Sequence, residues 1–249
     1  MPKPQVACQL IVFRERLPAE MESVLKDVKD AGYAGVEYGL PEDPDVLRRF
    51  EAALNEQRLA LSGSHMSYYK LDQFEAHLAY LKRHGSNLLM ISTTGDRKDG
   101  AASYRRAVKE LNVRGRQAAD AGVRFCYHNH SWEFKEVFDG VSGMDILLQE
   151  TDPRYVHFCF DTYWLADGGV DVVEYLRTYR ERIGCLHLKD RKAGTFTEVG
   201  AGEIDWPGVF RAIEPLNLPW VVTEKDRTET DPALSARQSR AYLQTAVGV

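Results

Sequence analysis

Two kinds of segment alternate along this chain, and the alternation constrains its fold more than any other feature of the sequence. Short apolar runs are each followed by a longer stretch in which apolar residues recur every three to four positions, patterns typical of buried strands and of amphipathic helices. Strands are predicted at residues 6–13, 35–38, 59–65, 87–92, 123–128, 156–161, 183–188 and 220–224. Helices are predicted at residues 18–30, 45–56, 71–83, 104–121, 143–150, 170–179, 206–213 and 232–245.

Strict alternation of this kind predicts parallel strands joined by right-handed crossovers. The length of 249 residues matches the typical size of an eightfold βα barrel. The competing fold, an open doubly wound sheet, would be expected to carry a GxGxxG loop after its first strand, and the sequence has no such loop there. We therefore predict a single α/β domain over residues 1–249, folded as a (β/α)8 TIM barrel.

The charge balance and the distribution of apolar residues exclude several classes of partner. Acidic residues number 37 and basic residues 32, spread along the chain, for a formal net charge of -5. Such a chain has no concentrated positive field for a phosphate backbone, so nucleic acid is not expected as a partner. No apolar run approaches the ~20 residues of a membrane helix, and the N-terminus lacks a signal-peptide pattern. We expect a soluble, cytoplasmic protein that does not bind membranes, with its four dispersed cysteines as buried thiols.

Polar side chains stand at the ends of nearly all the predicted strands. In a βα barrel the C-terminal strand ends form the active-site face, so polar residues there carry the most information about function. Successive side chains of a strand alternate between its two faces, so His128 and His130 share a face, as do His187 and Lys189. The strand-end residues are Glu37, His65, His128, His130, Asp161, His187, Lys189 and Glu224.

The last of these strands end in residue types that bind metal ions. Asp161, His187 and Glu224 would place several charges in one buried region, which is costly without a cation. Carboxylate and imidazole ligands together suit Mn, Co or Zn, and suit Mg less well. The sequence therefore predicts one divalent metal ion at the mouth of the barrel.

Longer motifs lie at or after the same strand ends. They are YHNHSWEF from Tyr127, DTYW from Asp161, HLKD from His187, GAGEIDW from Gly200 and EKD from Glu224. Together they resemble the sugar phosphate isomerase/epimerase family of xylose isomerase-like TIM barrels, over essentially the whole chain. In that family Glu, Asp, His and Glu from strands five to eight hold one divalent ion. The resemblance implies that Asp161, His187 and Glu224 are three of the ligands, with His128 at the strand-five position.

Two departures from the family pattern bear on the chemistry. The ketose 3-epimerases of the family use the glutamates of strands five and eight as an acid/base pair on the two faces of an enediolate, and here the resemblance leaves only Glu224 in that role. His128 replaces the other glutamate, and Glu133 in the following loop is a candidate for reaching the metal or for acting as a second base. The epimerases also carry a histidine where this chain has Trp164.

A divalent ion bound to a ketone and an adjacent hydroxyl acidifies the neighbouring C–H bond and stabilises the enediolate that forms when a base removes the proton. Returning the proton elsewhere gives isomerisation or epimerisation, whereas expelling a β-oxygen substituent gives elimination. The candidate acid/base residues are Glu224, Glu133 and His130, in that order. The candidate substrate contacts are Glu37, His65, Trp164 and Lys189.

We expect first an isomerase or epimerase of a keto-sugar or related polyol, and second a lyase or dehydratase acting on 3-keto-glycosides, inososes or similar keto-polyols. A non-catalytic sugar-binding subunit is the third candidate. Endonucleases with this barrel use several metal ions and extra His and Glu ligands, which a single set of strand-end ligands does not match. The expected partner is a small carbohydrate, and the sequence is compatible with a monomer and with a homo-oligomer.

Overall fold

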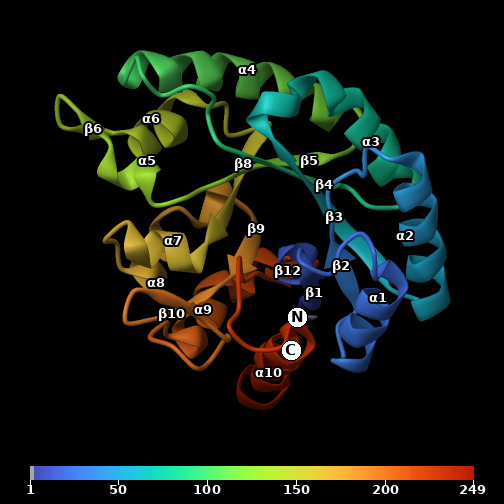
Figure 1. Ribbon diagram of the computed structural model, residues 1–249. Coiled ribbons are helices and arrows are strands. Elements are labelled where there is room, and N and C mark those ends of the chain that lie inside the picture. Colours follow the sequence, from blue (N-terminus) through green and yellow to red (C-terminus); the bar gives the residue numbers. More distant parts are fainter. Residues whose placement is uncertain (1–2) are drawn as a thin grey trace.

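Eight parallel strands close into a barrel in the computed structural model, which describes residues 3–249. The strands follow one another around the ring in chain order, and the last one pairs with the first, where Thr223 lies beside Cys8 (Figure 1). The strands are β1 (Gln5–Gln9), β2 (Gly35–Glu37), β3 (Ala60–Ser67), β4 (Leu88–Ser92), β5 (Arg124–His128), β8 (Val156–Asp161), β9 (Ile183–Leu188) and β12 (Trp220–Thr223). The predicted (β/α)8 TIM barrel is confirmed.

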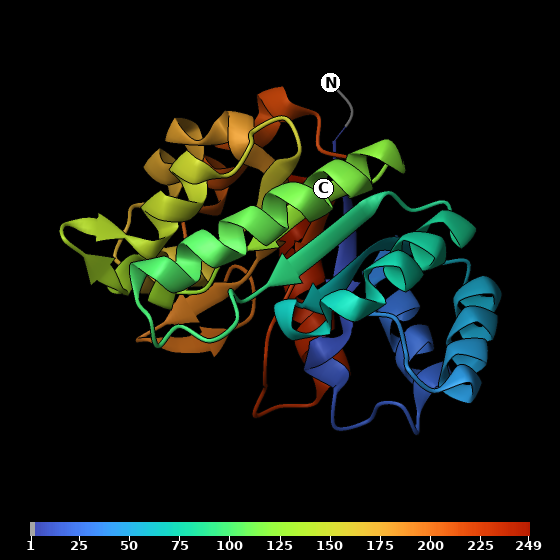
Figure 2. The same ribbon diagram turned by 90° about the horizontal axis from the view of Figure 1, so that it is seen from above.

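Helices surround the ring of strands, and the long helix α4 crosses the outer surface of the barrel in the side view of Figure 2. They are α1 (Met21–Asp30), α2 (Pro44–Gln57), α3 (Phe74–Arg83), α4 (Ala101–Asp120), α6 (Gly143–Glu150), α8 (Val172–Thr178), α9 (Trp206–Ile213) and α10 (Pro232–Tyr242). Asp43, Asp171, Asp205 and Asp231 each accept a hydrogen bond from a backbone N–H of the first turn, and Ser142 forms a capping box, so these helices begin where a side chain satisfies a free N–H group. Among residues 3–249, no helix combines the length and the apolar composition required to cross a bilayer.

The barrel interior beneath the mouth is filled by small and sulfur-containing side chains. Cys126, Cys159, Cys185 and Val222 are fully buried in one cluster there. Each lies two positions before a strand-end residue of β5, β8, β9 or β12, so the two side chains share the inward-facing side of their strand. All four cysteines of the chain are buried and free, as expected.

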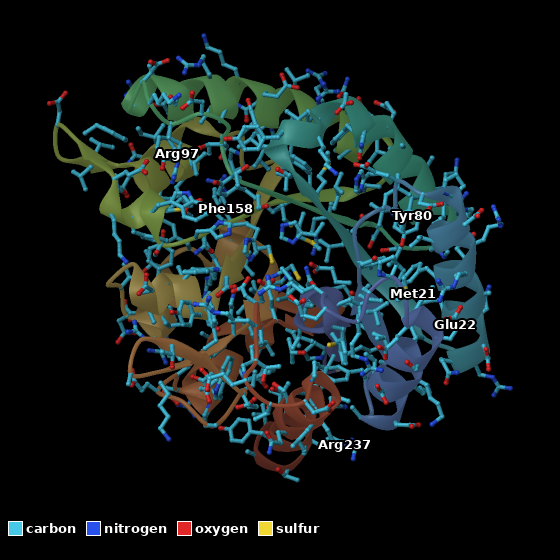
Figure 3. All side chains as sticks on the ribbon, viewed as in Figure 1. Met21, Glu22, Tyr80, Arg97, Phe158 and Arg237 are labelled. Carbon is cyan, nitrogen blue, oxygen red and sulfur yellow. The ribbon has the colours of Figure 1, made fainter. Side chains whose placement is uncertain are left out.

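The outward-facing side chains of the strands pack against the helices in a second, larger core. Met21 of α1 and Phe158 of β8, both labelled in Figure 3, are fully buried in it. Strands covered on both faces read as nearly continuous apolar runs, which is why the sequence pattern located them well.

The sequence pattern missed the short elements that extend the mouth of the barrel. The predicted first strand ends at Gln9, and the next residues form the 3-10 helix η1 (Leu10–Phe13). The other missed elements are η2 (Tyr68–Gln73), α5 (Trp132–Lys135), β6 (Val137–Phe138), β7 (Val141–Ser142), α7 (Thr162–Asp167), β10 (Asp190–Lys192) and β11 (Thr195–Thr197). Two or three residues are too few to show a period, so these hairpins depend on local turn geometry such as the positive φ angles of Asp139 and Gly140.

Candidate metal centre

Four side chains of metal-binding type meet at the C-terminal ends of adjacent barrel strands. His128 ends β5, Asp161 ends β8, His187 lies near the end of β9, and Glu224 directly follows β12. Each offers one ligand atom, and these atoms all lie within 4.8 Å of one another. His128 Nε2 is 3.5 Å from Asp161 Oδ2 and 3.8 Å from Glu224 Oε2, while His187 Nδ1 contacts Glu224 Oε2. All four side chains are buried, so they form a preformed cluster at the floor of the barrel mouth.

The hydrogen bonding of this cluster fits a metal ion. Both ring nitrogens of His128 and the Oδ2 atom of Asp161 are buried without a hydrogen-bond partner among residues 3–249. A buried polar atom without a partner is costly, and a cation between His128 Nε2 and Asp161 Oδ2, which lie 3.5 Å apart, would satisfy these two atoms together. Two imidazoles and two carboxylates form a borderline-hard donor set that suits a transition-metal dication. The grouping therefore agrees with the predicted metal site.

A second layer of contacts orients His187. Glu37 of β2 is fully buried, and its Oε2 atom lies 2.9 Å from His187 Nε2. Its other oxygen lies 3.3 Å from Nδ1 of His65. Because both oxygens contact imidazole rings and Glu37 does not line the cavity, its position does not agree with the predicted substrate contact. A carboxylate behind a histidine fixes the tautomer so that the opposite nitrogen, here Nδ1, is free to bind a metal.

Replacing Glu37 by Gln is expected to weaken metal affinity by about 10- to 100-fold, because an amide holds the His187 ring less firmly and no longer increases its basicity. Calorimetric titration with Mn²⁺ or Zn²⁺ measures the effect. The exposed Glu22→Gln, at a residue of α1 that pairs with Arg49 and does not line the cavity, is the matched control and should bind metal as the unmodified protein does. Equal affinities for all three proteins would show that Glu37 does not orient the ligand.

Lys189 supplies a buried positive charge beside the cluster. Its Nζ atom lies 3.0 Å from Glu224 Oε1, 3.5 Å from Asp161 Oδ2 and 2.5 Å from Asp226 Oδ2. The ammonium group is also 4.7 Å from the ring centroid of Trp164. Lys189 is completely buried, so the structure places this predicted substrate contact among carboxylates rather than in open solvent. The ammonium neutralises part of the negative charge of the site.

Burial and neighbouring charges shift the pKa values of the cluster in opposite directions. Burial raises the pKa of Asp161 to about 7. Burial, together with the adjacent His187, lowers the pKa of His128 well below its usual value and so keeps this imidazole neutral. Burial also opposes the charge of His187, but Glu37 and Glu224 outweigh it and raise the pKa of this imidazole.

The pKa of Glu224 is lowered, in contrast to that of the other carboxyl of the cluster, Asp161. Burial acts against ionisation of this carboxyl, but Lys189 and His187 outweigh it and hold the pKa well below the usual range. For Lys189, burial acts against the charge, and Asp161 and Glu224 overcome it and raise the pKa of the ammonium. At neutral pH, Glu224 is therefore a carboxylate and Lys189 is a cation.

Metal affinity is expected to increase as the pH rises from about 5.5 to about 8. Metal binding needs Asp161 as a carboxylate and His187 as a neutral imidazole. The raised pKa of each group means that both hold protons near pH 6 and release them when metal binds. Titration calorimetry in buffers with different heats of ionisation measures this proton release. An affinity that is constant or decreases over this range would contradict the expected sign.

Glu133, predicted as a second base, is not part of the cluster. Its Oε1 atom accepts a hydrogen bond from the Tyr127 hydroxyl at 2.7 Å, and its Oε2 atom accepts one from the His130 backbone N–H at 2.8 Å. The side chain is fully buried and does not line the cavity. The Oε1 atom that is bonded to Tyr127 also lies 3.9 Å from Nδ1 of His130, so the carboxylate lies behind His130 rather than in the cluster. The geometry therefore gives no support to a role for Glu133 as a base.

His130 faces the cavity and is held by aromatic rings. Its ring stacks on Trp132 with centroids 3.9 Å apart and an interplanar angle of 12°, and Trp164 lies 5.5 Å away on another side. Arg97, labelled in Figure 3, places its guanidinium 4.6 Å from the Trp132 ring centroid. The stack fixes the orientation of His130 at the cavity wall, 5.1 Å from the ring of His128.

Asp190 and Asn129 support the site, although the strand-end pattern predicted a role for neither of them. Asp190 Oδ2 accepts hydrogen bonds from the indole of Trp206 at 2.8 Å and from the backbone N–H of Gly200 at 2.9 Å. These bonds tie the GAGEIDW loop to the start of β10, and Trp206 is a buried anchor of that loop. The Oδ1 atom of Asn129 accepts a hydrogen bond from the backbone N–H of Asp161 at 3.0 Å. Asp190 belongs to the HLKD motif and Asn129 to the YHNHSWEF motif, and membership in these motifs is the sequence feature that could have indicated their roles.

A cavity of about 630 Å³ opens above the cluster. His128 and Glu224 line its floor, and His65 and His130 line its walls. Among the predicted substrate contacts, His65 therefore faces this cavity, whereas Trp164 lines a neighbouring hollow beside the β10–β11 hairpin. The volume lies in the range of small-molecule sites, about 300–1,000 Å³.

Comparisons with known proteins agree with the barrel fold. A family model described as "xylose isomerase-like TIM barrel" matches residues 25–246. An inosose dehydratase of Geobacillus thermodenitrificans is 26% identical, and the match covers 92% of this chain and 90% of the relative.

Two solved structures extend the comparison to the fold. A sugar phosphate isomerase/epimerase from Parabacteroides distasonis has a TM-score of 0.79 at 22% identity, with 100% of this chain and 96% of that chain covered. The IolI protein, solved with a bound zinc atom, has a TM-score of 0.76 at 13% identity, with 98% of each chain covered. These chains share the barrel architecture described above.

Proposed function

The chain belongs to the xylose isomerase-like TIM barrel family, and from this premise we propose that it is a divalent-metal-dependent lyase that eliminates a β-oxygen substituent from a keto-sugar or cyclic keto-polyol. The observation that carries the proposal is the convergence of His128, Asp161, His187 and Glu224 in one buried cluster, of which His128 and Glu224 line the cavity. The similarity to inosose dehydratases supports elimination as the reaction, since dehydration of an inosose is the loss of a β-hydroxyl group.

The arrangement of proton-transfer groups favours elimination over epimerisation. Epimerisation needs a proton removed on one face of a carbon and returned on the other, whereas elimination needs one base and one proton donor for the leaving oxygen. Glu224 is ionised at the cavity floor, whereas His128 is a neutral ligand type and Glu133 is bonded to Tyr127. An isomerase or epimerase, which the sequence ranked first, becomes the second candidate. It keeps that place because His130 faces the same cavity as Glu224 and supplies a second proton-transfer group.

Glu224, His130 and Lys189 have different roles in the proposed elimination. When bound, a divalent ion would draw electron density from the substrate carbonyl and acidify the adjacent C–H bond. Glu224 removes that proton, the C–H electron pair forms a carbon–carbon double bond, and the β C–O bond breaks. His130 donates a proton to the departing oxygen, so that water or an alcohol leaves. Lys189 keeps Glu224 in the deprotonated form that a base must have.

Incubation of the metal-loaded protein with an inosose in heavy water tests the proposal. The expected result is an absorbance band of a conjugated unsaturated ketone and a product lighter by one water. Deuterium incorporation with an epimer or isomer as product, and without loss of water, would instead establish the second candidate. Absence of any reaction with a panel of keto-polyols and keto-sugars, with Mn²⁺, Co²⁺ or Zn²⁺ bound, would refute both.

A further inference from the structure

The cavity above the candidate metal centre has two chemically different parts. The part next to the cluster is polar and includes His65, Ser67, Ser92, His128, His130 and Glu224. The other part, which we call the apolar arm, is formed by the segment after β1, the segment after β2 and the first turn of α2. It is lined by Leu10, Ile11, Leu17, Tyr38, Pro41 and Val46.

The apolar arm is rigidly supported on the side of α2. The Tyr38 ring packs on Phe50 with centroids 5.1 Å apart, and Phe50 is fully buried on α2. Tyr38, Pro41 and Val46 are only partly buried themselves, so their free faces are turned to the cavity. An aromatic ring with a free face offers a wide apolar contact at little cost in side-chain entropy.

A free inosose or simple sugar does not match this arm. Such a molecule carries a hydroxyl group on nearly every carbon, and hydroxyls pressed against Ile11, Leu17 or Val46 would lose their water without gaining a partner. The polar part beside the metal centre, by contrast, offers His65, His130 and two serines as hydrogen-bond partners. The polar part therefore suits the hydroxyl groups of a sugar ring, and the arm suits a group of different chemistry.

The charges at the rim argue against an anionic group in the arm. Glu42 and Asp43 line the rim together with Arg14. Glu42 is paired with Lys70, and Arg14 lies 3.6 Å from Glu15, so the arm carries no concentrated positive charge. A phosphate binds where several cations or backbone N–H groups converge, which is not the case here.

We propose that the substrate is a keto-sugar glycoside whose apolar, O-linked aglycone lies in the arm while its sugar ring lies against the metal centre. This inference rests on the proposed lyase function and names its substrate class. In a 3-keto-glycoside, the C2–H bond breaks to the base, the electron pair forms a C1–C2 double bond, and the C1–O bond to the aglycone breaks. The aglycone oxygen takes a proton and leaves as an alcohol or phenol, so no oxidant or reductant is needed.

The test compares phenyl and methyl 3-keto-glucosides on the metal-loaded protein and on variants of the arm. The measured quantity is the ratio of kcat/KM for the phenyl to the methyl substrate, because the leaving-group effect is common to all variants and cancels between them. Ile11→Asn and Val46→Asn are expected to lower this ratio about tenfold, as for the loss of an apolar contact in a specificity pocket. Val46→Trp, which fills the arm, should lower it as well.

Two controls separate the possible failures. Leu234→Asn, at an exposed apolar residue of α10 outside the cavity, should leave the ratio unchanged, and melting temperatures check that each variant is folded. An unchanged ratio in all three folded arm variants would overturn the inference while leaving the lyase function intact. If no keto-glucoside or inosose reacts, the lyase function fails. Calorimetric binding of phenyl and methyl β-glucosides then tests whether the arm binds an apolar aglycone. If the phenyl glucoside binds more tightly than the methyl glucoside, and Val46→Asn removes the difference, the aglycone site is supported. Equal affinities for the two glucosides refute it.

Discussion

Asp161→Asn is expected to abolish metal binding and to lower turnover by about a thousandfold or more. The substitution removes one of two carboxylates of the cluster, and a metal ion that polarises the substrate carbonyl is worth several kcal/mol in the transition state, where each 1.4 kcal/mol is about tenfold in rate. The fold should survive, because an asparagine Oδ1 atom can still accept the hydrogen bond that Asp161 Oδ1 accepts from the Trp164 backbone N–H at 3.1 Å. Metal content by elemental analysis and turnover of a keto-polyol are the two measurements.

Asp167→Asn is the matched control for this substitution. Asp167 lies six residues further along the chain on α7, where it pairs with Lys135 at 2.6 Å outside the cluster. It should retain metal and activity. His187→Ala should repeat the loss seen with Asp161→Asn, since it removes a second ligand from the same cluster. Full activity of Asp161→Asn without bound metal would eliminate the metal-dependent mechanism.

Lys189→Met is expected to destabilise the metal-free protein by about 3–5 kcal/mol in free energy of unfolding. The change removes the only side-chain ammonium within 4 Å of Glu224 among residues 3–249, and leaves Asp161 and Glu224 buried without that compensation. Methionine fills a similar volume, so the loss reports the charge rather than a cavity. Denaturant unfolding of the metal-free protein measures the effect.

Added metal should restore part of this stability, which separates the proposed charge effect from simple misfolding. A dication bound by Asp161 and Glu224 takes over the neutralisation, so metal should raise the melting temperature of Lys189→Met more than that of the unmodified protein. Lys26→Met is the control, because Lys26 forms an exposed, solvent-screened pair with Asp30 and its loss should leave the free energy of unfolding almost unchanged. Equal stability of Lys189→Met and Lys26→Met would show that Lys189 is not needed to neutralise the site.

The two predictions bear on different parts of the proposed function. Loss of metal in Asp161→Asn tests the convergence of ligands on which both the lyase and the isomerase candidates depend. The behaviour of Lys189→Met tests why Glu224 is ionised and thus available as a base. Elimination and isomerisation differ in what happens after proton removal, so the products formed from an inosose decide between them.

The strands and the cluster were accessible from the sequence for a simple reason. Barrel strands are buried on both faces, which makes them apolar runs, and their side chains alternate with a period of two. The same parity that points Cys126 and Cys159 into the barrel points His128 and Asp161 into its mouth. Residue type and position in the strand were therefore enough to predict that these side chains come together.

The positions of Glu37, Glu133 and Lys189 could not be obtained in this way. Glu37 and His187 are 150 residues apart in the chain, and their contact exists because closure of the barrel brings β2 and β9 within three strands of each other, with both side chains pointing to the interior. Glu133 was a reasonable candidate base by distance along the chain, but its carboxylate bonds to Tyr127 on the opposite face of β5. Local sequence patterns predict on which face of a strand a side chain lies. They do not predict which hydrogen-bond partner a flexible carboxylate contacts.

The sequence by itself determined the barrel, the face on which its functional residues lie, and a donor set suited to a dication, because these follow from short-range periodicity and residue chemistry. Only the tertiary structure decided that Glu37 lies behind His187, that Lys189 is enclosed by carboxylates, and that the segments after β1 and β2 add an apolar arm to the cavity. Each of these depends on contacts between loops and strands distant in the chain. Such contacts are set by how the whole barrel closes and leave no periodic signal in the sequence.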